Sequence, residues 1–143
     1  VISVMIPDQS GRTLSGQTPE AFWYSVAHAR PLAIGVNCSL GPDLMRPYVA
    51  ELSRVADTYV AAYPNAGLPN TMGDYDETPE SMVAHMQEWL DSGLVNIIGG
   101  CCGTTPEHIA AFAKAAADAS PRVPPQLEPV MRLSGLEPMK LAG

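Results

Sequence analysis

A strand–turn–helix pattern that occurs four times is the feature that most constrains the fold of this chain. Strand-like runs rich in apolar and β-branched residues begin near residues 1, 32, 58 and 94. Each run is followed by a turn and then by a segment with a helix-start signal. Strands that alternate with helices in this way are typical of βα units, whose strands lie parallel in one sheet. The sequence therefore predicts an α/β fold built from parallel βα repeats.

Three of the four expected helices begin with the same Thr-Pro-Glu triplet, at residues 18–20, 78–80 and 105–107. The Thr hydroxyl can accept a hydrogen bond from a backbone N–H of the first turn. Pro is favourable at the first helical position, because the N–H that it lacks would have no partner within the helix. The acidic side chain complements the positive end of the helix. A weaker version of this signal, at residues 41–43, precedes the second helix. Pro47 lies further along that segment and predicts a short turn before a helix that begins at Pro47.

Four βα units can form half of a (β/α)8 barrel, which usually takes about 250 residues, or an open doubly wound sheet. The composition changes after residue 120, and prolines crowd the end of the chain. These prolines are Pro121, Pro124, Pro125, Pro129 and Pro138. We therefore divide the chain into βα units at residues 1–120 and a Pro-rich linker or extended strap at residues 121–143.

The charge composition excludes several classes of protein. The chain has 8 Lys and Arg against 15 Asp and Glu, a net charge of −7, and the basic residues are scattered. Nucleic-acid binding needs clustered basic residues, so we exclude a nucleic-acid module. Apolar runs fall short of the roughly 20 residues that span a membrane. Without a recognisable signal peptide and with an odd number of cysteines, the sequence predicts a cytoplasmic protein with reduced thiols.

Three cysteines follow the predicted strands. Cys38 ends the strand that begins at Leu32, and Cys101 and Cys102 follow the strand that begins at Leu94. Because the carboxyl ends of parallel strands meet at one edge of a sheet, we expect the three sulfur atoms to converge there. Three thiolates suit Zn²⁺ first among the metals, with a fourth coordination position open to a substrate thiol.

Other interpretations of these residues remain open. A cysteine at a strand end, such as Cys38, is often a small buried hydrophobic residue, and an adjacent pair framed by glycines can form a vicinal disulfide or a redox pair. The histidines are expected at solvated or packed positions within helices, away from the strand ends. They are His28, His85 and His108. The acidic residues of the segment 74–77 are expected in a solvated loop.

Two stretches resemble the zinc-binding signature of the homocysteine S-methyltransferase family, at residues 35–38 (GVNC) and 99–106 (GGCCGTTP). Residues 10–18 (SGRTLSGQT) and 63–69 (YPNAGLP) are similar to the cobalamin-dependent methionine synthase branch of that family. Residues 132–138 (RLSGLEP) are similar to the segment that leads there into a folate-binding module. The resemblance covers essentially the whole chain.

This resemblance implies the second half of a (β/α)8 TIM barrel at residues 1–120 and a linker toward a folate-binding module at residues 121–143. It implies that Cys38, Cys101 and Cys102 bind zinc, that Asn65 holds the amino-acid end of homocysteine, and that Asn37 orients the site. The implied reaction transfers a methyl group to homocysteine and gives methionine. The donor would be methylcobalamin, recharged from methyltetrahydrofolate, and both would be carried on other modules of the same polypeptide.

The N-terminal half-barrel of the family lies outside this sequence, and so do the folate and cobalamin modules. We therefore expect the isolated chain to be inactive and to associate, because the strands at residues 1–6 and 94–98 would have open edges. The inner sheet face, with Ile34 and Val36 or their neighbours, would meet water. The alternatives are a homocysteine methyltransferase that uses betaine or S-methylmethionine, and a non-catalytic zinc-binding or redox thiol fragment.

Overall fold

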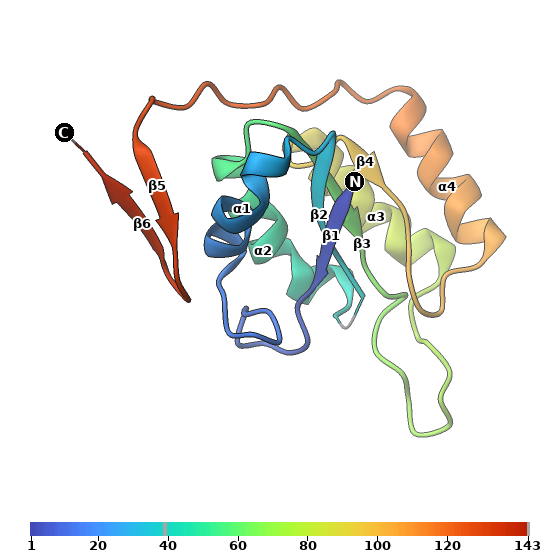
Figure 1. Ribbon diagram of the computed structural model, residues 1–143. Helices are drawn as coiled ribbons and strands as arrows, with labels where there is room; N and C mark the ends of the chain where they lie inside the picture. The colour runs from blue at the N-terminus through green and yellow to red at the C-terminus, as the bar shows by residue number, and fades with distance from the viewer. Residues whose placement is uncertain (39, 143) are drawn as a thin grey trace.

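The computed structural model describes residues 1–38 and 40–142, and a four-stranded parallel sheet lies at its centre (Figure 1). The strands pair in the order of the chain: β1 (Ile2–Met5), β2 (Ala33–Asn37), β3 (Tyr59–Tyr63) and β4 (Ile97–Ile98). Four α-helices and one short 3-10 helix alternate with them: α1 (Pro19–Val26), η1 (Ala27–Ala29), α2 (Pro42–Val55), α3 (Pro79–Asp91) and α4 (Pro106–Ala117). Among the described residues, no helix has the length and apolar character needed to cross a membrane.

The order of the strands distinguishes between the two architectures that the sequence allowed. Each strand pairs with the next one along the chain, and α1 contacts α2, α2 contacts α3, and α3 contacts α4. Right-handed βα crossovers that progress in one direction place all the helices on the same face of the sheet. A doubly wound sheet reverses direction and places helices on both faces. The structure thus confirms the parallel βα units and has the strand order of half a (β/α)8 barrel.

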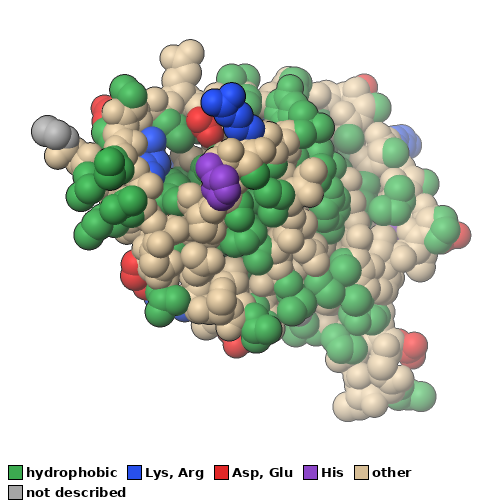
Figure 2. Space-filling model, viewed as in Figure 1, with side chains coloured by type: hydrophobic (Ala, Val, Ile, Leu, Met, Phe, Trp, Pro, Cys, Tyr) green, Lys and Arg blue, Asp and Glu red, His purple; other side chains and the backbone are tan. Residues whose placement is uncertain are grey.

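The hydrophobic core lies between the sheet and the helices. Ile34 and Val36 of β2 are fully buried, and they pack on this side with large helical side chains. These helical side chains are Trp23, Met45, Val49, Leu52, Met82, Met86, Trp89 and Phe112. Because strand side chains alternate, Gly35 and Asn37 point to the opposite face. The inner face thus carries the neighbours of Ile34 and Val36. Of these, Ala33 and Gly35 are buried and Asn37 is half-buried, so, contrary to the expectation, this part of the face is not open to water. In Figure 2, hydrophobic and uncharged side chains cover most of the visible surface.

Two of the three Thr residues predicted to cap helices do so, whereas Thr105 pairs with the His108 side chain through its N–H and its hydroxyl. The Thr18 hydroxyl accepts a hydrogen bond from Ala21 N at 3.1 Å, and the Thr78 hydroxyl accepts one from Ser81 N at 3.2 Å. The prediction for Pro47 is wrong, because α2 runs without a break from Pro42 to Val55. Pro42 at the first position already starts this helix, and a proline in its second turn removes only one backbone hydrogen bond.

The tail contains an element that the sequence did not predict. Residues 119–130 cross one end of the molecule as irregular chain, and β5 (Met131–Ser134) and β6 (Pro138–Leu141) then form an antiparallel hairpin beside α1 (Figure 1). One hairpin face carries only apolar side chains, and all of them are exposed. These are Met131 with its partner Leu141, and Leu133 with its partner Met139. The strap therefore ends in a structured and amphipathic hairpin.

The tip of the hairpin docks on the loop that follows β1. Arg12 forms an ion pair with Glu137, and the Gln17 side chain donates to Gly135 O at 3.1 Å. Thr18 N donates a further hydrogen bond to a main-chain oxygen of the tip at 3.0 Å. The stretches 10–18 and 132–138, which are far apart in the sequence, therefore contact each other.

Arg122 anchors the start of the tail. It is only 5% exposed, and its guanidinium donates to the main-chain oxygens of Ser53 and Ala56, both at 2.7 Å, and of Thr58 at 2.8 Å. The first two oxygens lie at the carboxyl end of α2, where a positive charge is favourable. Although Arg122 lies beyond the boundary predicted at residue 120, it packs against the βα units.

We predict that Arg122→Met lowers the free energy of unfolding by about 3 kcal/mol, because it leaves several buried carbonyl oxygens without a donor. Arg54→Met, at an exposed position of α2, should change it by no more than about 0.5 kcal/mol. Urea titrations that follow the fluorescence of the buried Trp23 and Trp89 measure both effects. Equal losses in the two variants would show that Arg122 contributes only as surface charge.

Candidate metal centre

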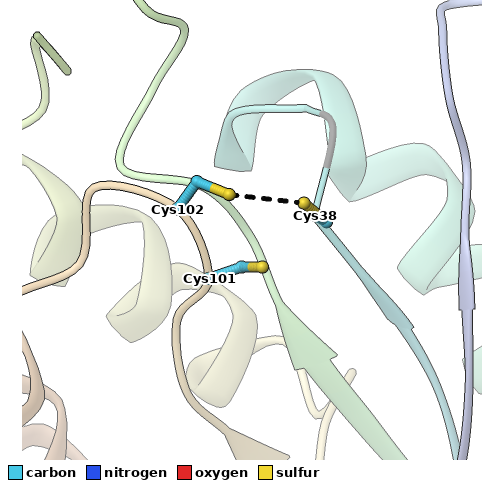
Figure 3. A group of neighbouring side chains, drawn as sticks. All are labelled: Cys38, Cys101 and Cys102. Carbon is cyan, nitrogen blue, oxygen red and sulfur yellow. Dashed lines mark hydrogen bonds between the residues drawn. The ribbon is translucent and has the colours of Figure 1, made fainter.

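The three cysteines converge at the carboxyl edge of the sheet. Cys38 directly follows β2, while Cys101 and Cys102 follow β4 after two glycines. Their sulfur atoms all lie within 4.8 Å of one another, and those of Cys38 and Cys102 are 3.6 Å apart (Figure 3). The convergence expected from the positions of these residues after parallel strands is therefore confirmed. Their role as metal ligands stays a prediction.

A short segment that begins at the last residue of β3, residues 63–66, positions the cysteine-bearing loops on either side of it. Cys38 N donates a hydrogen bond to Tyr63 O at 2.9 Å. Cys101 N donates to Pro64 O, also at 2.9 Å. The chain that leaves the third strand thus acts as a shared template. Main-chain hydrogen bonds of ordinary length fix the backbone positions of cysteines that are far apart in the sequence.

Asn65 completes this template. Its side-chain oxygen accepts a hydrogen bond from Cys102 N at 3.1 Å, and Ala66 N donates to Cys102 O at 2.9 Å. Asn65 N also donates to Leu40 O, and the residue is only 4% exposed. The family resemblance implied that Asn65 holds the amino-acid end of homocysteine, and this role stays a prediction. The structure adds a contact that the sequence did not reveal, because the amide fixes the main chain of a candidate ligand.

The backbone at Cys38 adopts an unusual conformation. Its φ of 62° lies in the left-handed region, which few non-glycine residues occupy and which costs about 1 kcal/mol. Strained residues of this kind concentrate at functional sites. This turn ends β2 and directs the Cys38 sulfur toward Cys102 (Figure 3).

Asn37 lies one residue before Cys38, at the end of β2. Its side-chain oxygen accepts a hydrogen bond from the Ser3 hydroxyl at 2.6 Å, which links β2 to β1. This contact runs along the inner face of the sheet, away from the sulfur atoms. The expected role of Asn37 in orienting the site stays a prediction, and its described partner lies on the neighbouring strand.

His108 lies at a packed position within a helix, as the sequence predicted, and it links the start of α4 to the end of the preceding loop at Glu77. It occupies the first turn of α4, close to the vicinal cysteines, and is only 5% exposed. Its Nδ1 accepts a hydrogen bond from Thr105 N, so its Nε2 carries the proton and donates to Glu77 O at 2.9 Å. Its position three residues after the capping threonine was the available sequence signal.

Tyr75 is a second residue near the site that the sequence analysis did not single out. It lies in the loop between β3 and α3, which was expected to be solvated. A Cβ atom added at Gly103 would lie 2.3 Å from Tyr75 Cγ, so the ring packs directly on the main chain beside Cys102. Partial burial, and then the nearby Cys102 with the charge of the other two cysteines, raises the pKa of Tyr75 above its ordinary value.

The electrostatics and geometry of the cluster fit a metal cation. Burial and the adjacent Cys38 and Cys102 raise the pKa of Cys101 to about 11, because neighbouring thiolates repel one another. A divalent cation at the centre of the cluster would offset this repulsion. Tetrahedral zinc with bonds of about 2.3 Å places its sulfur ligands about 3.8 Å apart, close to the observed separations. The donor set therefore suits zinc and leaves one ligand position for a substrate.

Comparison with known protein families agrees with this site. The chain matches the sequence model described as Homocysteine S-methyltransferase over residues 1–116. The matched region contains all four βα units and all three cysteines, whereas the hairpin lies beyond it. Because the match extends over most of the 143 residues, the chain belongs to the homocysteine S-methyltransferase family.

Proposed function

We propose that this chain forms the zinc-binding half of a homocysteine-binding (β/α)8 barrel and takes part in methyl transfer to homocysteine. The observation that carries the proposal is the convergence of Cys38, Cys101 and Cys102, whose sulfur atoms lie within 4.8 Å of one another at the carboxyl edge of the sheet. In βα proteins this edge carries the active site. Family membership supports homocysteine as the methyl acceptor.

The residues of this chain bind and orient the substrate sulfur. Zinc, when bound, holds a coordinated thiol as thiolate at neutral pH and so makes it nucleophilic. Three cysteines occupy three ligand positions and leave the fourth for the homocysteine sulfur. Asn65 fixes Cys102, which keeps the ligand positions constant as the substrate enters. The amino end of α4 points its positive dipole toward this edge, which favours an anionic sulfur or carboxylate.

For the methyl donor we propose methylcobalamin, recharged from methyltetrahydrofolate, as in the cobalamin-dependent methionine synthase branch. The stretches 10–18 and 132–138 both resemble that branch, and they contact each other through Arg12, Gln17 and the hairpin tip. This contact supports the interpretation that the tail belongs to a larger multi-module enzyme. A donor such as betaine or S-methylmethionine needs no such tail, and a purely redox thiol pair would not explain the third sulfur of Cys38.

We predict that the chain binds one zinc ion and that Cys102→Ala abolishes stoichiometric binding. The substitution removes one of the three sulfur ligands and leaves a site with only two. Elemental analysis after gel filtration measures the zinc content. Ser120→Ala is a suitable control, because Ser120 is exposed and lies after α4, outside the cysteine loops. Unchanged zinc affinity in Cys102→Ala would contradict the proposed centre and favour the non-catalytic alternatives.

Asn65→Ala should lower zinc affinity about tenfold, the lower end of the effect of losing a hydrogen-bond partner next to a metal ligand. The variant removes the acceptor for Cys102 N. The same variant should weaken homocysteine binding by about 1–3 kcal/mol if Asn65 also contacts the substrate. Competition with a colorimetric zinc chelator and calorimetric titration with homocysteine separate the two effects. Wild-type values in both experiments would assign Asn65 to neither role.

We predict that the isolated chain shows no measurable turnover and associates in solution. Its sheet has open edges at β1 and β4, and parallel sheets are normally covered on both faces. Size-exclusion chromatography and an assay with free methylcobalamin and homocysteine test these expectations. A stable monomer that turns over substrate would show that the four βα units suffice for activity.

A further inference from the structure

The His108 side chain joins two loops that lie beside the cysteine cluster. It lies in the first turn of α4 and is only 5% exposed. On one side, its Nδ1 accepts a hydrogen bond from Thr105 N at 3.2 Å and lies 2.8 Å from the Thr105 hydroxyl. On the other side, its Nε2 donates to Glu77 O at 2.9 Å, at the end of the loop between β3 and α3. Both ring nitrogens are engaged by the protein, so the imidazole acts as a bridge between the two loops.

The main chain at Glu77 is tied in turn to the loop of Cys102. Glu77 N donates to Ala66 O at 3.1 Å, and Ala66 N donates to Cys102 O at 2.9 Å. The same two segments also pack closely, because a Cβ atom added at Gly67 would lie 2.9 Å from Glu77 Cγ. A continuous path of hydrogen bonds therefore runs from His108 through the main chain to a candidate metal ligand.

The turn between β4 and α4 closes this path into a ring. Thr105 follows Cys102 by three residues, and Thr104 N donates to Cys101 O at 3.1 Å across the turn. The turn is compact, because a Cβ atom added at Gly100 would lie 2.6 Å from Thr104 Cβ. A shift of Thr105 is therefore transmitted to Cys102.

We propose that His108 is a positioning residue of the metal centre, which holds the loop of Cys101 and Cys102 against the segment 63–66. This inference deepens the proposed function and rests on it. Apart from the imidazole, the hydrogen bonds of the ring join main-chain atoms. A loop without this bridge would keep its sulfur atoms in register with Cys38 for only part of the time, and metal affinity falls with the fraction of chains that are competent to bind.

Two substitutions separate the two sides of the imidazole. His108→Gln places an amide N–H near the position of Nε2, so it keeps the donor to Glu77 O and loses the acceptor for Thr105 N. His108→Asn places a carbonyl oxygen near the position of Nδ1, so it keeps the bond at the start of α4 and loses the link to Glu77. We expect His108→Asn to lower metal affinity about tenfold and His108→Gln to restore most of that loss.

The test uses the full chain and Co²⁺ alone. Competition with a chelator measures the affinity, and the visible absorption bands of the bound ion report the geometry of its ligands. In the metal-free chain, NMR-detected hydrogen exchange of the Ala66 amide reports the link itself, since this amide donates to Cys102 O. We expect faster exchange in His108→Asn than in wild type or His108→Gln. His28→Asn is the matched control, because His28 is exposed and lies in η1, before β2.

The positioning role predicts a selective loss in His108→Asn. A greater loss in His108→Gln, or equal losses in both variants, would show that His108 serves only to stabilise the start of α4 and would overturn the proposal. Unchanged affinity and exchange in both variants would overturn it as well. Failure of the wild-type chain to bind Co²⁺ or Zn²⁺ would instead contradict the proposed function. Exchange of the Ala66 amide needs no metal and would still test the link, so the two failures are distinguishable.

Discussion

The hydrogen bonds of residues 63–66 are the constraint on which the rest of the site depends. Cys38 and Cys102 are 64 positions apart, and parallel pairing alone brings them only to the same edge of the sheet. The segment after β3 closes the remaining distance, because it lies between the two cysteine loops and hydrogen-bonds to the main chain of all three cysteines. The geometry of the cysteine cluster is thus set mainly by hydrogen bonds to the main chain of the three cysteines.

Two other elements lie at the same end of the sheet. The hairpin tip docks on the loop after β1 through Arg12 and Gln17, and the loop that carries Tyr75 follows β3. The other end of the sheet, where the strands begin, has a structural role. There Arg122 binds main-chain oxygens at the carboxyl end of α2. This separation follows the pattern of βα proteins, in which chemistry lies at the carboxyl ends of the strands and stability at the amino ends.

The fold and the cysteine cluster could be predicted because they depend on local signals. Repeated helix caps and strand spacing indicate parallel βα units, and a parallel sheet places Cys38 and Cys102 at one edge. Tyr75, the hairpin and Arg122 could not be predicted, because their roles arise from tertiary contacts between segments far apart in the sequence. A loop rich in Gly, Pro and Asn is typical of solvated chain, and nothing local shows that one of its tyrosines packs on Gly103.

The long sequence separation of Cys38 and Cys102 has a consequence for folding. A metal ion that joins them acts as a reversible cross-link around the chain between them, which includes β3, α3 and β4. Closing a loop of this size in the unfolded chain would cost about 4 kcal/mol in conformational entropy by the relation used for disulfides. Metal loading would therefore resist unfolding of the whole half-barrel, and metal supply would control the lifetime of the folded protein as well as its chemistry.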